Sequence, residues 1–198
     1  LTSLVCGQQV DFEDIHTEGI THISATDIKY AKAMGRVIKL LATSKKTDGG
    51  YVAMVAPFLL PKEHPLYNVN GVFNAIFVRG NVLGDAMFYG SGAGKLPTAS
   101  AVVADVVEMA KNLDKNIPVE WSSKKLELVD YRSAKNRFFV RVSGTDKASV
   151  EKIFGNVDYI DAQGVTGELG FVTEEMTEEA LENKKAAYGE VLNVIRVA

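Results

Sequence analysis

One glycine-rich segment has residue types and spacing suited to binding a ligand. Gly90, Gly92 and Gly94 stand between a predicted strand and a predicted helix, in the run Phe88-Tyr-Gly-Ser-Gly-Ala-Gly-Lys-Leu-Pro-Thr-Ala99. Glycines lack Cβ atoms and let backbone N–H groups approach a phosphate or a cofactor, and a helix start adds positive potential there. The same spacing also suits a tight strand-to-helix turn that needs positive φ. Both interpretations stay open on the residues alone.

The two common nucleotide-binding motifs do not fit this segment. A Walker A loop would need glycine where the chain has Tyr89, and serine or threonine where it has Leu96. The dinucleotide fingerprint fails as well, because Gly94 comes one residue too early for its third glycine. A P-loop kinase and a self-contained Rossmann site are therefore not supported. Lys95 is a candidate phosphate ligand, but a solvated lysine at a helix start is the favoured interpretation.

Two further polar stretches are candidates for a site. The amide side chains between Asn68 and Asn74 either order a turn or line a site, and the turn is favoured. An acidic cluster near the N-terminus is either a set of acid/base carboxylates or a solvated loop face, and the loop face is favoured. The members of this cluster are Asp11, Glu13, Asp14 and Glu18.

Histidine and cysteine add no recognisable centre. His16, His22 and His64 lack the spacing of a metal site, so no metal is assigned. Cys6 lies in an apolar stretch, where a packing role is favoured over that of a nucleophile. The sequence therefore contains no obvious catalytic centre.

Composition restricts the class of protein. The chain has 198 residues with 46% apolar residues, enough for one ample core or two small ones. Its 22 basic and 25 acidic residues give a net charge of −3 without a basic stripe, which argues against nucleic acid as a partner. The longest apolar stretch, 51–60, contains Pro57 and is shorter than the roughly 20 residues of a membrane span. A single cysteine and the absence of a signal-peptide pattern predict a cytoplasmic setting.

The first 113 residues predict an α+β layer with a mostly antiparallel sheet backed by helices. Leu1 to Cys6 reads as the end of a helix that begins upstream, so we expect the chain to be a fragment. Ile20 to Ser24 reads as a short extended run, and a capping box of Ser24 and Asp27 starts the next helix. Two hairpins and a long helix with Pro97 in its first turn follow, with the strands at 37–42, 51–58, 71–78 and 82–89 and the helix ending near 113.

The C-terminal part predicts a second module. The apolar period is lost across residues 114–136, which we interpret as a linker. Residues 137–198 then alternate in the order βαββαβ, which is a ferredoxin-like split unit. A module of this size gains stability by pairing with a second copy.

Several stretches together resemble homoserine dehydrogenase, in its two-domain bacterial form with a regulatory module. The resemblance runs through Glu18-Gly-Ile-Thr-His-Ile-Ser, Asp27-Ile-Lys-Tyr-Ala, Ile38-Lys-Leu-Leu and Leu60-Pro-Lys-Glu-His-Pro-Leu. It continues through Val69-Asn-Gly-Val-Phe-Asn-Ala75 and the glycine-rich run to Asp105, so it covers residues 7–113 almost continuously. Residues 1–113 are thus expected to be the C-terminal part of a substrate domain.

The resemblance implies an oxidoreductase that interconverts L-aspartate 4-semialdehyde and L-homoserine with NAD or NADP as the hydride carrier. This step leads towards threonine, methionine and isoleucine. In the family, a loop of the type Gly-x-Gly-x-Gly contacts the cofactor, which here implies Gly92, Ala93 and Gly94. The family's catalytic lysine and its Rossmann domain are expected before Leu1, so no catalytic residue is assigned and we expect the chain alone to be inactive.

Residues 137–198 resemble an ACT domain, which implies a homodimer or a higher homo-oligomer and threonine as a feedback effector. The usual Asp-x-Pro-Gly of its first loop reads Asp146-Lys-Ala-Ser149 here. We therefore favour an assembly role over threonine binding. The alternative to an enzyme part is a dimerising, effector-binding module without catalysis, and the weakest hypothesis is an independent phosphate-binding domain on the glycine-rich loop.

Overall fold

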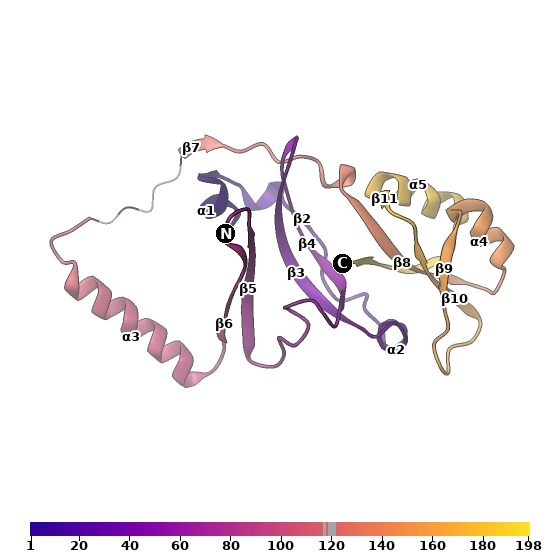
Figure 1. Ribbon diagram of the computed structural model, residues 1–198, viewed down its shortest axis with the longest axis horizontal. Helices are drawn as coiled ribbons and strands as arrows, with labels where there is room; N and C mark the ends of the chain where they lie inside the picture. Colours follow the sequence, from indigo (N-terminus) through magenta and orange to yellow (C-terminus); the bar gives the residue numbers. More distant parts are fainter. Residues whose placement is uncertain (117, 119–121) are drawn as a thin grey trace. The chain divides into compact units, whose positions relative to one another are not determined.

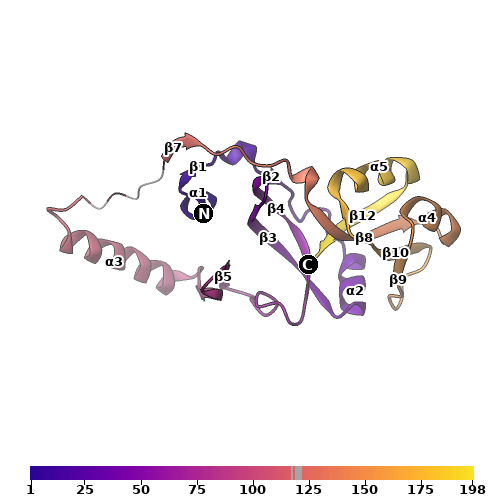
Figure 2. The ribbon, with the colours of Figure 1, turned by 45° about the horizontal axis from the view of Figure 1, so that its top comes forward.

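The computed structural model describes residues 1–116, 118 and 122–198, which fall into two compact units. The first unit joins Leu1–Lys62 to the described residues from 122 to 198, and the second holds the described residues of 63–120. The elements of both units are traced in Figures 1 and 2. Residues 117 and 119–121 of the expected linker lie outside the described residues.

The first unit begins with four short elements, which are followed by one capped helix. The helix begins after Ser24 because the expected capping box forms: Asp27 N donates to Ser24 Oγ at 3.2 Å, and Ser24 N donates to Asp27 Oδ2 at 2.7 Å. Ile20 to Ser24 is not the expected extended run, because Ile23 N bonds Ile20 O at 3.0 Å and closes a turn. The elements are α1 (Thr2–Cys6), β1 (Gln8–Gln9), η1 (Phe12–Asp14), β2 (His16–Thr17) and α2 (Ala25–Ala33).

A long antiparallel hairpin follows, as the sequence predicts. It consists of β3 (Arg36–Thr47) and β4 (Gly50–Pro61), which pair along their whole length. The other edge of β4 pairs in parallel with β2 and with the last strand of the chain. β4 is mostly buried because it has neighbours on both edges.

The C-terminal part forms the expected βαββαβ unit. Its sheet has the order β12-β8-β10-β9 with antiparallel neighbours, which is the order of a split βαβ fold. Phe138, Val140 and Val142 point to one face, where they pack with Phe154 and Leu181 of the two helices. The elements are β8 (Lys135–Ser143), α4 (Lys147–Phe154), β9 (Val157–Ile160), β10 (Glu168–Thr173), β11 (Met176–Thr177), α5 (Glu178–Tyr188) and β12 (Val191–Val197).

The opposite face of this sheet is covered by α2. Phe139 and Val172 from the sheet share one apolar cluster with Tyr30 and Ala31 of α2. Successive side chains of a strand point to opposite faces, so β8 contributes to both clusters. The sheet of the C-terminal unit thus lies between the two helices of that unit on one face and α2 on the other.

Strands from both ends of the chain share one eight-stranded sheet. β12 pairs in parallel with β4, where Arg196 lies opposite Phe58. Part of the expected linker is also structured: β7 (Ser122–Lys125) pairs in parallel with β1, and η2 (Tyr131–Ser133) follows it. The expected division at 114–136 therefore does not coincide with the division into compact units.

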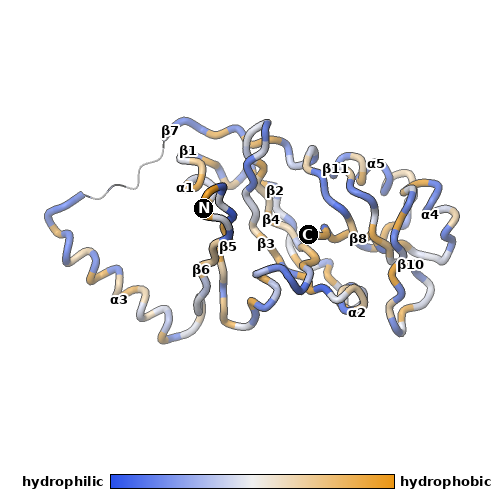
Figure 3. Tube along the Cα trace, in the orientation of Figure 1, coloured by the Kyte–Doolittle hydropathy of each residue, from blue (hydrophilic) through white to orange (hydrophobic). Residues whose placement is uncertain are grey.

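The second unit holds the second expected hairpin, β5 (Phe73–Gly80) with β6 (Gly84–Ser91), and the helix α3 (Lys95–Lys111). None of its described residues is buried. The apolar Val102 and Val106 of α3 are 57% and 59% exposed, so α3 contributes no buried side chain to a core within the second unit. Figure 3 shows hydrophobic residues interspersed with hydrophilic ones along α3.

Candidate functional site

The glycine-rich loop joins β6 to α3 within the second unit. Gly94 is the N-cap residue of α3, and its φ of +119° is a conformation that L side chains rarely adopt. A Cβ atom on Gly92 would lie 1.9 Å from Nδ2 of Asn74, so this position tolerates only glycine while Asn74 stays in place. The structure thus confirms a strand-to-helix turn with positive φ, while contact of Gly92, Ala93 and Gly94 with a cofactor stays a prediction.

Asn74 connects the loop to the neighbouring strand. It lies on β5 opposite Gly90, and the ends of β5 and β6 line a shallow cavity of about 280 Å³ that includes Asn74, Gly90 and Gly92. The amides before it order a turn, because Asn70 Nδ2 donates to Asn68 O at 3.3 Å. The amide-rich stretch therefore orders a turn, as favoured from the sequence, and a role in lining a site stays a prediction.

Lys95 has an exposed side chain at the first position of α3. This exposure agrees with a solvated lysine at a helix start. Backbone N–H groups of a helix's first turn have no intrahelical partner and attract negative charge. The loop is therefore chemically suited to an anionic group held by its backbone.

The acidic cluster of the first unit is divided between two basic partners. Asp11 and Asp14 both lie 2.8 Å from Nζ of Lys125, and the hydrogen bond from Lys125 lowers the pKa of Asp11. Glu18 lies apart from them and binds Arg196. Asp11, Asp14 and Glu18 are therefore engaged in ion pairs, and Asp11 and Asp14 share one lysine.

The histidines and Cys6 have local partners. His16 stacks on Tyr131 with a centroid distance of 3.7 Å, and its Nε2 lies 2.7 Å from Oε1 of Glu18. Burial lowers the pKa of His64. The thiol of Cys6 is half-buried and lies near backbone oxygens, which agrees with packing. Within the described part of the chain, no group of three histidine, cysteine or acidic side chains has the geometry of a metal site.

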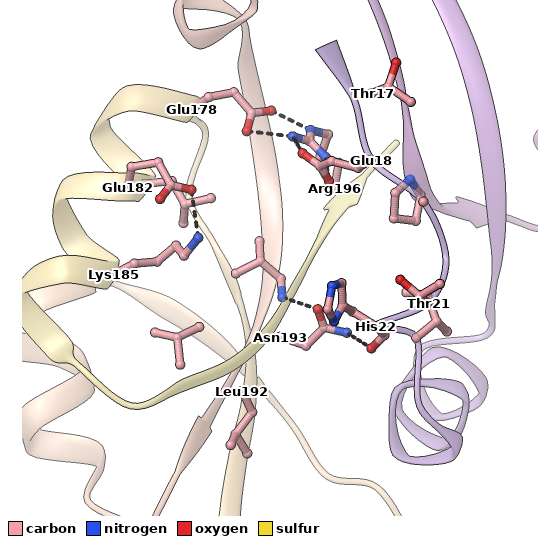
Figure 4. Close-up of a pocket in the computed structure, with 16 residues that line it drawn as sticks. Thr17, Glu18, Thr21, His22, Glu178, Glu182, Lys185, Leu192, Asn193 and Arg196 are labelled. Carbon is pink, nitrogen blue, oxygen red and sulfur yellow. Dashed lines mark hydrogen bonds and ion pairs between the residues drawn. The ribbon is translucent and has the colours of Figure 1, made fainter.

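A polar cavity that sequence reasoning missed lies in the first unit, between α5, β12 and residues 17–23. It has a volume of about 560 Å³, and Arg196 forms part of its wall (Figure 4). Oε1 of Glu178 lies 2.6 Å from Nε of Arg196, and both carboxylate oxygens of Glu18 accept from its terminal nitrogens at 2.7 and 2.8 Å. The side chain of Arg196 is only 6% exposed, so this is a buried cationic group between two carboxylates.

Electrostatics at this cavity follow from that arrangement. Burial alone would raise the pKa of Glu18, but hydrogen bonds from Arg196 and His16 outweigh it and lower the pKa to about 2. Elsewhere on the wall, Lys185 pairs with Glu182 at 2.8 Å (Figure 4). The cavity therefore contains several charges that are already compensated by one another.

Asn193 joins the two sides of the same cavity. Its Nδ2 donates to the backbone oxygen of His22 at 3.2 Å, while its Oδ1 accepts from Val194 N at 2.9 Å (Figure 4). This side chain thereby satisfies one backbone N–H group of β12 and the backbone carbonyl of His22. The sequence signal for the cavity was weak, because Asn193 and Arg196 occur in a strand with no recognisable motif.

A second buried arginine lies on the face of the sheet that α2 covers. Arg141 of β8 donates from Nη1 to Oδ1 of Asp27 at 2.8 Å and from Nη2 to Oε2 of Glu168 at 2.7 Å. Asp27 is fully buried. Burial alone would raise the pKa of Asp27, but hydrogen bonds from Ser24 and Arg141 lower it.

The fold and the site define an α+β protein that carries a glycine-rich strand-to-helix loop and a C-terminal βαββαβ unit. A family model for homoserine dehydrogenase matches residues 1–107, which is more than half of the chain. The chain therefore belongs to the homoserine dehydrogenase family. Among its described residues, no helix is long and apolar enough to cross a membrane.

Curated relatives extend this match into the C-terminal part. A homoserine dehydrogenase of Corynebacterium glutamicum is 41% identical over 157 residues, which cover 76% of this chain and 35% of that protein. Another from Synechocystis sp. is 39% identical over 175 residues, which cover 86% of this chain and 39% of that protein. The chain thus spans between a third and two fifths of the length of these relatives.

Solved structures agree with this assignment. A homoserine dehydrogenase from Thiobacillus denitrificans matches with a TM-score of 0.81 and 25% identity, over all of this chain and 50% of that one. The enzyme from S. aureus at pH 6.0 matches with a TM-score of 0.74 and 29% identity, again over all of this chain and half of the other. The α+β class expected from the sequence is thereby confirmed.

Proposed function

We propose that this chain supplies part of a homoserine dehydrogenase, an oxidoreductase that interconverts L-aspartate 4-semialdehyde and L-homoserine with NAD or NADP. The reaction belongs to the synthesis of threonine, methionine and isoleucine. The observation that carries the proposal is the loop at residues 90–94, which has the family's glycine spacing and a helix start behind it. When bound, the nicotinamide cofactor supplies the hydride chemistry.

Gly92, Ala93 and Gly94 are the residues that would hold the cofactor. The loop fits such a group because its residues are exposed and because glycine at positions 92 and 94 places no side chain of its own over the backbone. The first turn of α3 offers the N–H groups of Lys95 and Leu96, since Pro97 has none, and N–H groups at a helix start favour a negatively charged group. The role of these residues is to bind and orient, since none of them carries an ionisable side chain.

Proton transfer is assigned to no residue of this chain. Hydrogen bonds from basic side chains lower the pKa of Asp11 and of Glu18, which leaves both poor general acids, and Asp14 is paired with Lys125. We propose that the acid/base lysine of the family belongs to a part of the enzyme that these 198 residues do not include, since they span 35–39% of the curated relatives. The 198-residue chain alone is then expected to oxidise no homoserine, and steady-state turnover by the purified chain would contradict this.

A chimera tests the proposed function itself. The chain replaces the matching segment of the Corynebacterium glutamicum relative, and reduction of aspartate semialdehyde is followed by the loss of NAD(P)H absorbance. We expect activity from the chimera and a raised KM for NAD(P)H when it carries Gly94→Ala. A chimera that folds, as judged by cooperative melting, but has no activity would refute the proposal.

Assembly is the role we propose for the βαββαβ unit, with an ACT-like domain as its type and a homodimer as its product. Within the described residues, β9 has a strand partner on one edge only, so a second copy can extend the sheet there. Threonine binding is disfavoured because Asp146 already caps α4, accepting from Ala148 N at 3.1 Å and from Ser149 Oγ at 2.6 Å.

Two measurements test this second proposal. Light scattering is expected to give twice the mass of the 21.5 kDa chain. Calorimetry with threonine is expected to give no heat. A monomer would contradict the assembly role, and saturable heat would show that the module is an effector site instead.

A further inference from the structure

Two buried arginines connect the C-terminal unit to one short N-terminal segment. Arg141 and Arg196 lie on β8 and β12, and their side chains are 9% and 6% exposed. Their partners Asp27 and Glu18 lie 114 and 178 residues away in the sequence, within ten residues of each other. The segment Glu18–Asp27, called the tethered segment here, is thus held at both of its ends.

Each arginine also has a carboxylate partner inside the C-terminal βαββαβ unit. Glu168 of β10 binds two nitrogens of Arg141 at 2.9 and 2.7 Å, and Glu178 of α5 binds two nitrogens of Arg196 at 2.6 and 3.0 Å. Each guanidinium therefore bridges one carboxylate of the tethered segment and one of the C-terminal unit. Figure 4 shows this bridge at Arg196.

These bridges resist separation because the charges have little access to water. A buried charge that loses one partner keeps its desolvation cost without the compensating attraction. Release of the tethered segment would leave Arg141 and Arg196 each with a single carboxylate. Asp27 is fully buried and also accepts from Ser24 N, so its bridge is linked directly to the start of α2.

Apolar contacts support the same connection. Tyr30 of α2 packs so closely on β10 that a Cβ on Gly170 would lie 2.3 Å from its ring. Ala31 lies in the same cluster with Phe139. Opening the contact between α2 and the sheet would therefore expose apolar surface as well as charge.

We propose that Arg141 and Arg196 are positioning residues that make the tethered segment and the C-terminal unit open and close together. Local opening of one region then makes local opening of the other more frequent. A change in the βαββαβ unit is thereby transmitted to α2 and the turn before it. The coupling is reciprocal, because it is a shared free energy between two regions. It extends beyond the proposed function and does not depend on catalysis or on threonine.

Hydrogen exchange on the 198-residue chain tests this proposal. Arg141→Met is expected to raise the rate of amide hydrogen exchange at least about tenfold in two elements. These are β10 and α2, which lies on the other side of the contact. Arg196→Met is expected to do the same in residues 16–23 and at the start of α5. Asp27→Asn is the reciprocal variant, and it must raise exchange in β10 although it changes only α2.

Arg137→Met is the matched control. Arg137 lies on the same strand as Arg141, but its partners Asp158 and Thr173 both belong to the C-terminal unit, and its side chain is 47% exposed. We expect less than a twofold change in α2 for this variant. Unchanged exchange of α2 in Arg141→Met, or an equal rise in the control, would overturn the proposal.

Conservative variants keep the test valid if a methionine variant does not fold. Arg141→Lys and Arg196→Lys retain the charge but lose the two-pronged geometry. Each is expected to raise exchange in the same pair of regions by a smaller factor. A rise confined to the strand that carries the substitution would show a local effect and refute the coupling.

Discussion

Gly170→Ala tests the close packing of Tyr30 on β10. Gly170 is buried in β10 between two strand neighbours, and a Cβ there would lie 2.3, 2.6 and 2.8 Å from three atoms of the Tyr30 ring. Carbon atoms normally approach to about 3.5–4.0 Å, so ring and strand must separate by roughly 1 Å. Neither moves freely, because Tyr30 is 2% exposed and packs on Phe139 with a centroid distance of 5.1 Å.

Overpacking of this kind costs about 1–3 kcal/mol. In a domain of this size, each kcal/mol lowers Tm by about 2–4 °C, so we expect a fall of about 2–12 °C in calorimetry. Gly19→Ala is the control, since Gly19 is exposed and its Cβ would meet nothing within 4 Å. In a Tyr30→Leu background, Gly170→Ala is expected to cost much less.

An equal Tm for Gly170→Ala and the unmodified chain would refute the close contact between α2 and the sheet. An equal cost in the Tyr30→Leu background would show that the strain arises elsewhere in β10. Either result would remove the apolar part of the connection between α2 and the C-terminal unit.

Three further predictions concern charge, capping and the loop. The pKa of Glu18 is lowered from 4.5 to about 2 in the folded chain. Its contribution to stability is therefore complete above pH 4.5 and is lost as the pH falls towards 2. The free energy of unfolding of Glu18→Gln is expected to depend less on pH across that window. Ser24→Ala removes the N-cap of α2 and is expected to cost about 0.5–2 kcal/mol in urea unfolding, and no change would contradict the capping box. Gly94→Ala places a Cβ at φ +119° and is expected to raise hydrogen exchange in the first turn of α3. Gly90→Ala is the control, because a Cβ on Gly90 would meet nothing within 4 Å. Equal exchange in both variants would contradict strain at Gly94.

Local patterns predicted most of the elements. The capping box of Ser24 and Asp27, both hairpins and the βαββαβ order follow from spacings of a few residues, and each is present. The run at Ile20 failed because its apolar residues lie in a turn. Periodicity alone does not distinguish such a turn from a short strand.

The candidate site was predicted in part. Glycine at positions 90, 92 and 94 indicated a special loop, and the structure supplies a positive φ at Gly94 and a close neighbour at Gly92. Asn74 as that neighbour was not predictable, because it lies on another strand. The cavity beside Arg196 gave only a weak signal, since an arginine in a strand reads as an ordinary exposed residue.

The sequence by itself determined the family, most of the elements and the order of the C-terminal unit, because these depend on residues near one another along the chain. Only the tertiary structure decided that β12 pairs with β4, that α2 covers the βαββαβ sheet, and that Arg141 and Arg196 bind carboxylates more than a hundred residues away. Such partners are selected by burial, since a charge removed from water needs an opposite charge at hydrogen-bonding distance wherever the fold provides one. That selection leaves no trace in the local spacing of residues.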